Sequence, residues 1–265
     1  MESSNYTLLD LGYLDLAIGL ALILIVAGIS RWEQLKLEYD IAIAAVRTLL
    51  QLLAVGYVLK YIFALNNAAL IILAIIAMIV VAARTVTGRQ KKQTRELSFL
   101  VAFAMSVGSG ISLFIATQIM LQIKPWYEPH YLIPLAGMVI GNSMNGATLA
   151  VERIDSEIDL RRSEIEAYLA LGATAKQAAA SCIRAAMKAA MIPTINSMMV
   201  VGIVSLPGMM TGQILSGTSP LIAVKYQIVI MYMIAFSVAV SSFILAKLRF
   251  KRYFTADHQL RDECI

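Results

Sequence analysis

Long apolar runs are the feature that most constrains what this chain can fold into. Hydrophobic residues make up 59% of its 265 positions and charged residues only 15%, whereas a soluble globular domain carries roughly 25% charged residues. Most of the runs reach the roughly 18–20 residues that an α-helix needs to cross a bilayer. Because so little polar surface cannot cover even one soluble domain, the sequence predicts an all-α, polytopic integral membrane protein.

The runs predict about seven transmembrane helices within a single domain at residues 1–265. We place the spans at about residues 12–30, 41–63, 67–86, 97–122, 131–150, 189–215 and 219–246. Basic residues concentrate in cytoplasmic loops. Of the 22 Lys and Arg residues, two, five, six and five lie in residues 31–40, 84–96, 151–188 and the tail from residue 247. We therefore expect a multi-pass protein of the plasma (inner) membrane, with its N-terminus outside and its C-terminus in the cytoplasm.

The net charge of +5 follows from this topology. The basic residues border the spans, where they meet anionic lipid headgroups. No basic patch interleaved with aromatic residues occurs, as a nucleic-acid surface would require. Membrane lipid is the expected partner, and nucleic acid is not.

One polar region, the predicted cytoplasmic segment 151–188, interrupts the apolar pattern. Its residues 156–171 predict a helix near the membrane interface, with Ile158, Ile165 and Leu169 at helical spacing and Glu157 on the other side.

A sharp corner is predicted directly after this helix. Gly172 supplies the left-handed residue that commonly ends a helix, and Thr174 with Gln177 forms a Thr-x-x-Gln capping box that starts the next one. Alanines at positions 173, 175, 178, 179 and 180 keep the corner slim, which suits insertion into a groove of a partner. The alternative is an amphipathic loop helix that rests on the membrane.

The stretch "EAYLALGA" resembles the Glu-Ala…Gly signature of ABC-transporter permeases, whose short cytoplasmic coupling helix docks on the ATPase subunit. Glu166, Ala167 and Gly172 stand at the matching positions, but Cys182 and Arg184 stand where that signature has apolar residues. The resemblance implies that an ATPase contacts this region, through Glu166, Ala167, Leu171, Gly172, Ala173, Thr174 and Gln177.

A closer resemblance runs from about residue 10 to 250. The segments "RTLLQLLAVGYVLKYIF", "IPLAGMVIGNSMNG", "LGATAKQA" and "VSLPGMMTGQILSGTSPLIAVKYQI" are similar to the FetB-type iron-export permeases, a family with plant aluminium-tolerance relatives. The resemblance implies the membrane subunit of an ABC exporter rather than an enzyme, with iron or its chelate as cargo in metal homeostasis.

An ATPase subunit is expected as a separate chain. No G-x-x-x-x-G-K-[ST] phosphate-binding motif occurs, and no polar region is long enough for a nucleotide-binding domain. We therefore expect no cofactor on this chain and ATP-Mg on the partner. Because a transport pathway needs two membrane halves, the permease is expected to be a homodimer.

Two polar pairs are candidates for the translocation path or its gating. Arg47 and Gln51 lie one helical turn apart on one face of the second span; Arg47 either snorkels to the membrane surface or makes a gating contact. Asn142 and Asn145 lie in the fifth span, beside Gly137-x-x-x-Gly141. They either hydrogen-bond between closely packed helices or line the path.

The stretch "SLPGMMTG" interrupts the sixth span. Pro207 removes a backbone donor and Gly208 permits a hinge, which predicts a broken helix that faces protein or a cavity. Pro207, Gly208, Met209 and Met210 are therefore further candidates for the translocation path or its gating. Met209 and Met210, with Met198 and Met199, raise the alternative of a soft metal site. Thioethers suit copper(I) better than iron(II), and adaptable packing is the favoured role of these methionines.

Glu128 and His130, in "YEPH", are candidates for a weak external metal site, against the alternative of a surface loop. His258 lies in the predicted inner tail, so the two histidines do not share a site.

An ATP-independent ion channel or secondary metal carrier is the alternative function. Carriers of this kind normally place carboxylates at mid-membrane, whereas the 17 acidic residues lie at span ends, in loops or in tails. No clear inverted repeat of half-length is present. Both observations favour the ABC permease.

Overall fold

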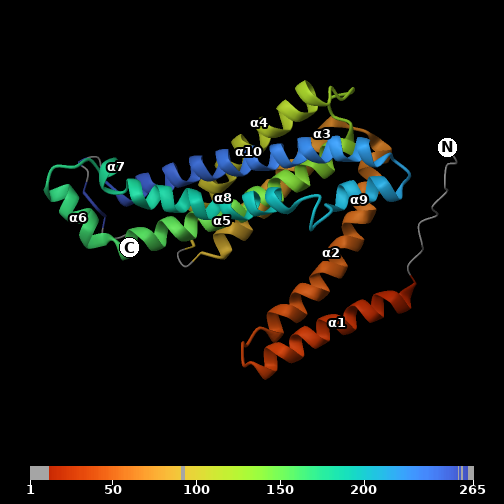
Figure 1. The fold of residues 1–265 in the computed structure, drawn as a ribbon, viewed down its shortest axis with the longest axis horizontal. Coiled ribbons are helices and arrows are strands. Elements are labelled where there is room, and N and C mark those ends of the chain that lie inside the picture. The colour runs from red at the N-terminus through yellow and green to blue at the C-terminus, as the bar shows by residue number, and fades with distance from the viewer. Residues whose placement is uncertain (1–11, 91–92, 256, 258, 262–265) are drawn as a thin grey trace. The chain divides into compact units, whose positions relative to one another are not determined.

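The computed structural model describes residues 12–90, 93–255, 257 and 259–261, and helices account for most of them (Figure 1). In chain order the elements are α1 (Tyr13–Trp32), α2 (Glu38–Leu65), α3 (Ala68–Gly88), α4 (Arg95–Phe114), the π-helix η1 (Ile115–Met120), α5 (Pro129–Leu160), α6 (Arg162–Ala170), α7 (Ala175–Ala178), α8 (Ala180–Val200), α9 (Gly208–Leu215) and α10 (Pro220–Tyr253). Within these ranges the only β pairing is two isolated bridges. The predicted all-α fold is confirmed.

Five of the described helices are long and apolar enough to cross a membrane: α1, α2, α3, α4 with η1, and α10. The fifth and sixth predicted spans lie on α5 and on α8 with α9, which are more polar. α5 carries the amides of Asn142 and Asn145, and α8 carries Arg184 and Lys188. The chain is a multi-pass membrane protein, and the count of seven spans stays a prediction.

The chain divides into two compact units, residues 1–66 with 215–217 and residues 67–214 with 218–265. In the first unit, α1 and α2 pack against each other. Ser30, which is 3% exposed, stabilises the loop between them, because its Oγ accepts a hydrogen bond from Leu37 N at 3.2 Å.

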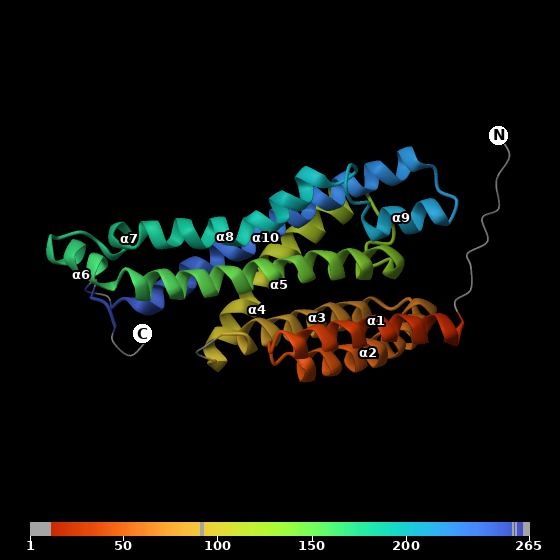
Figure 2. The ribbon, with the colours of Figure 1, turned by 60° about the horizontal axis from the view of Figure 1, so that its bottom comes forward.

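In the second unit, α10 packs along α4, α5 and α8, and α3 packs on α4 and α5 (Figure 2). Two glycines permit this packing. A Cβ atom at Gly108 would lie 2.9 Å from Ser241 N and 3.0 Å from Ser237 O, and one at Gly146 would lie 2.6 Å from Val238 Cγ1. α4 and α5 therefore approach α10 closely at Gly108 and Gly146.

The predicted Gly137-x-x-x-Gly141 pair makes no such approach. A Cβ atom at Gly137 would meet Met78 Cε at an ordinary 3.5 Å, and one at Gly141 would meet nothing within 4 Å. The prediction of close packing at this pair was wrong, because these glycines instead line an open apolar groove between α3 and α5.

Buried hydroxyl groups link α4, α5 and α10 near the close glycines. Ser143 Oγ lies 2.7 Å from Ser237 Oγ, and Ser109 Oγ lies 3.2 Å from the same atom. Ser112 Oγ donates a hydrogen bond to Met233 O at 2.9 Å. In lipid, such hydrogen bonds and close packing hold helices together.

Asn142 and Asn145 do not take part in this network. Asn142 Nδ2 donates to Met138 O of its own helix at 2.8 Å, and Asn145 is exposed. The predicted amide hydrogen bonds between helices are therefore not formed by these two residues; the neighbouring Ser143 makes such a contact with Ser237 instead.

The glycine contact predicts a position-specific loss of stability. Gly108→Ala forces its new methyl group into α10, so we expect the free energy of unfolding to fall by about 1–3 kcal/mol. Gly110→Ala, two residues along α4 with nothing within 4 Å of its Cβ position, is the matched control. Unfolding of the purified protein in mixed micelles measures both; an equal effect of the two substitutions would contradict the contact.

Candidate functional site

The corner between α6 and α7 is built as the sequence predicts. Gly172 has a φ of +87°, the left-handed region that disfavours other residues. Its N–H donates to Leu169 O at 3.0 Å, and Ala173 N donates to Tyr168 O at 3.0 Å. This pair of bonds is a Schellman motif, which satisfies the carbonyls left open at the end of α6.

The next helix begins with the predicted capping box. Thr174 N donates to Gln177 Oε1 at 2.9 Å, and Gln177 N donates to Thr174 Oγ1 at 3.4 Å. This helix, α7, is short: it ends at Ala178, and α8 begins at Ala180. Reciprocal capping makes the corner a defined structure rather than a loose loop.

The helix predicted over residues 156–171 is not one element. α5 continues to Leu160, the helix is interrupted at Arg161, and α6 begins at Arg162. Glu157, predicted on the outer side, is 4% exposed. It forms ion pairs with Arg153 and Arg161. The prediction missed that a carboxylate paired in this way can be buried beside Ile154 and Ile158.

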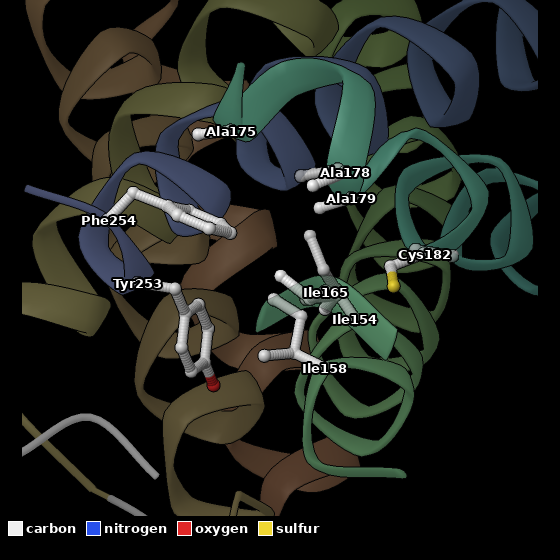
Figure 3. Close-up of a cluster of buried hydrophobic side chains, with 11 residues drawn as sticks. Ile154, Ile158, Ile165, Ala175, Ala178, Ala179, Cys182, Tyr253 and Phe254 are labelled. Carbon is white, nitrogen blue, oxygen red and sulfur yellow. The ribbon is translucent and has the colours of Figure 1, made fainter. Parts of the chain in front are cut away.

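A cluster of buried side chains lies directly beneath the corner (Figure 3). It joins five helices and the start of the C-terminal tail, and its members are Ile154, Ile158, Ile165, Ala175, Ala178, Ala179, Cys182, Ala186, Ala246, Tyr253 and Phe254. We call it the corner cluster. Three of the alanines that were predicted to make the corner slim for a partner face this cluster instead, so the corner's inner side is already occupied by its own protein.

The corner also contacts the C-terminal tail. Thr255 N donates to Gln259 O, and Arg261 N donates to Tyr253 O, each at 2.8 Å, so the tail folds back on the end of α10. Between the tail and α6 lies a polar cavity of about 390 Å³, lined by Arg162, Glu166, Leu169, Ala173, Asp257, Gln259 and Leu260. No sequence motif indicated this contact, because it joins segments about ninety residues apart.

An ion pair between α5 and α10 lies beside the corner cluster. Arg249 Nε and Nη2 donate to the two carboxylate oxygens of Asp155 at 2.9 and 2.8 Å. The Arg249 side chain is 12% exposed and that of Asp155 is 25% exposed. A two-point guanidinium–carboxylate contact fixes orientation as well as distance, so it sets the register of α5 against α10.

Most of the predicted coupling residues lie on the outer side of the corner. Glu166, Ala167, Leu171, Gly172, Thr174 and Gln177 are exposed and Ala173 is half-buried. Leu171 is 85% exposed. None of these seven side chains belongs to the corner cluster; Glu166 and Ala173 line the cavity beside the C-terminal tail, and an ATPase contact through the seven residues stays a prediction.

Arg47 and Gln51 share one face of α2, as predicted. Both line a shallow apolar groove along this helix, with Tyr39, Ala42, Ile43, Val46 and Leu50. Their role in gating stays a prediction.

The sixth predicted span is interrupted, but the break covers residues 201–207 and overlaps the predicted stretch 205–212 only at its start. α8 ends at Val200, and α9 begins at Gly208, directly after Pro207. Thr211 N and Oγ1 both donate to Pro207 O, at 3.0 and 3.1 Å, and the N–H bond is the first i to i−4 bond of the new helix. A Cβ atom at Gly208 would meet nothing within 4 Å, so the break leaves room for a hinge.

The four methionines of this region separate into two pairs. Met198 and Met210 line one apolar pocket, whereas Met199 and Met209 do not. Met199 is 72% exposed.

Glu128 and His130 lie together at the start of α5, with Oε1 and Nδ1 2.7 Å apart. Throughout the described ranges, no group of three or more His, Cys, Asp or Glu side chains could hold a metal ion. The pair supplies two ligands at most, and His258 and Cys264 lie outside the described residues.

These features define a class of protein: an all-α, multi-pass membrane protein with a structured polar corner at one end of its helix bundle. The chain belongs to the UPF0014 family, since the profile described as "Uncharacterised protein family (UPF0014)" matches residues 13–254.

Several relatives match along nearly their whole length. A UPF0014 membrane protein of Synechocystis sp. is 40% identical over 97% of this chain and 99% of its own. The Escherichia coli protein named "Probable iron export permease protein FetB" is 38% identical over 93% of each chain. Arabidopsis thaliana ALUMINUM SENSITIVE 3 is 33% identical over 94% of this chain and 90% of its own. No solved structure matches the chain. The resemblance to the FetB-type family is confirmed.

The Asp155–Arg249 ion pair predicts an unequal response to loss of a carboxylate. Asp155→Ala leaves a nearly buried guanidinium without its partner, so we expect the free energy of unfolding to fall by roughly 2 kcal/mol. Glu166→Ala removes an equally short but exposed pair with Arg162, and we expect a loss of about 0–1 kcal/mol. Equal losses of unfolding free energy in denaturant titrations would show that the Asp155–Arg249 pair stabilises the protein no more than an exposed pair does.

Burial predicts that the Cys182 thiol reacts slowly. The side chain is fully buried in the corner cluster, and burial raises the pKa of the Cys182 thiol above its usual value. Less thiolate is therefore present at any given pH. The rate of maleimide labelling at Cys182 should still rise with pH where the rate at an ordinary thiol has become constant.

Maleimide labelling in a Cys264→Ser background measures this reactivity. We expect Cys182 to react at least roughly ten times more slowly than the exposed thiol of Ser163→Cys on α6. Similar rates at both positions would mean that the corner opens readily.

Proposed function

We propose that this chain is the membrane subunit of an ABC transporter that exports iron or another metal ion, free or as a chelate. ATP-Mg binds and is hydrolysed on a separate ATPase subunit. The observation that carries the proposal is the α6–α7 corner, whose outer side is exposed and whose inner side is packed into the bundle. The name of the Escherichia coli relative, a probable iron export permease, supports iron as the cargo.

The corner is suited to pass a movement into the membrane helices. Its outer residues, Glu166 and Leu171 among them, offer an acidic and an apolar contact to a partner. Its inner residues belong to the corner cluster, which joins α5, α8 and α10. A displacement of the corner therefore moves packed helices rather than a loop, because close-packed interiors transmit strain.

Alternating access follows if the ATPase holds the corner differently in its nucleotide states. A ligand shifts a conformational equilibrium only by its difference in affinity for the two conformations. On this proposal the corner is cytoplasmic, the C-terminus with it, the N-terminus lies outside, and two copies of the chain form the pathway in the plasma membrane. The break between α8 and α9, with Pro207 and Gly208, is the hinge.

Co-purification of the chain with a candidate ABC ATPase from the same organism tests the proposal. We expect wild type to bind the ATPase and to stimulate ATP hydrolysis in nanodiscs. Glu166→Lys should abolish both, because it reverses the charge on the docking surface. Glu164→Lys, an exposed charge reversal on the same helix, is the matched control and should retain binding.

A backbone substitution provides an independent test. Gly172→Pro should also abolish binding, because proline cannot adopt its positive φ. Gly217→Pro carries the same backbone conflict in the α9–α10 turn, where φ is +90°, and should leave ATPase binding intact. If wild type binds no ATPase while metal flux persists without ATP, the chain is a channel or secondary carrier.

A further inference from the structure

A second concave site lies at the far end of the bundle from the corner, where α8 ends and α10 begins. It is an apolar pocket of about 320 Å³ between α8, α9 and α10. The arrangement of these three helices, with α6 and α7 at the opposite end, is visible in Figures 1 and 2. Tyr253 lies 26 positions after Gln227 on α10, which is about 39 Å at 1.5 Å per residue, so the pocket is remote from the corner cluster.

Three helices each contribute one thioether to this pocket. Met198 comes from α8, Met210 from α9 and Met231 from α10. Met210 and Met231 are each only 9% exposed. Methionines that merely fill space need not gather from separate elements around one cavity, so this arrangement calls for a ligand as well as a packing explanation.

The pocket also has a polar group that the protein leaves unused. Gln227 lines the pocket one helical turn before Met231 and is 6% exposed. Its Oε1 has no hydrogen-bond partner among the described residues. Buried polar atoms are almost always satisfied, and an exception calls for an unseen water or ion. This amide oxygen is therefore a candidate donor to a ligand in the pocket.

The donor set selects the class of ligand. No Asp, Glu, His or Cys lines the pocket, so a divalent ion would enter an apolar site without a compensating charge, at a high desolvation cost. Thioether sulfur favours soft ions such as copper(I). A monovalent soft ion has both the lower desolvation cost and the matching donors.

We propose that Met198, Met210 and Met231, with the Gln227 amide, form a binding site for a soft monovalent metal ion, copper(I) or its analogue silver(I). The site is separate from the coupling corner and requires neither the ATPase nor transport. It revises the favoured prediction from sequence, in which the methionines of this region serve packing alone.

The first test is a copper(I) titration of the purified full-length chain in nanodiscs, against a chromogenic copper(I) chelator under reducing, anaerobic conditions. We expect one ion per chain and at least a tenfold loss of affinity in the variant Met198→Leu/Met210→Leu/Met231→Leu. Leucine keeps the volume and apolarity of the pocket while removing sulfur. The matched control is Met199→Leu/Met209→Leu, which should bind as wild type does.

A second measurement uses the wild-type chain alone, so its result does not depend on whether the triple variant folds. With methyl-labelled methionine, silver(I) should shift the resonances of Met198, Met210 and Met231 and leave that of the exposed Met199 in place. X-ray absorption of the copper-loaded protein should detect sulfur neighbours. Equal copper(I) affinity in the triple variant, or only oxygen and nitrogen neighbours, would overturn the proposal. Because no ATPase is present, neither result bears on the coupling corner.

Discussion

Close contact of α10 with α4 and α5 is the interaction on which the second unit of the structure depends. Helices in lipid gain little from burying apolar side chains, because the lipid is as apolar as they are. The association rests instead on packing and hydrogen bonds, which Gly108 and Gly146 permit by bringing backbones together and which Ser143 and Ser237 provide. The 34-residue α10 is thereby held along most of its length, and both candidate sites lie against it.

On the function proposed above, the corner has two sides with different tasks. Its outer side offers exposed side chains such as Glu166 and Leu171 to a partner, whereas Ile165 and Ala178 anchor its inner side in the corner cluster. The Asp155–Arg249 pair adds an orienting contact beside that cluster. A docking surface that is anchored in this way transmits movement, whereas a flexible loop would absorb it.

The two sites lie at opposite ends of the same helices. α8 begins at the corner and ends at the methionine pocket, and α10 runs back from the pocket to the corner cluster. A shift of α8 against α10 would therefore alter the pocket between them. The pocket is lined by uncharged side chains, so an ion bound there, as we propose, would be held without a fixed carboxylate.

Local chemistry was sufficient to predict several features from sequence: the helical membrane architecture, the Gly172 turn, the Thr174–Gln177 cap and the break at Pro207. Each depends on residues within a few positions of one another or on the period of an apolar run. Contacts between distant segments depend on helix rotation and depth, which apolar runs leave undetermined because every face of such a helix is apolar. Only the tertiary structure therefore decided that Glu157 is buried, that serines rather than Asn142 join the helices, and that three separated methionines share one pocket with Gln227.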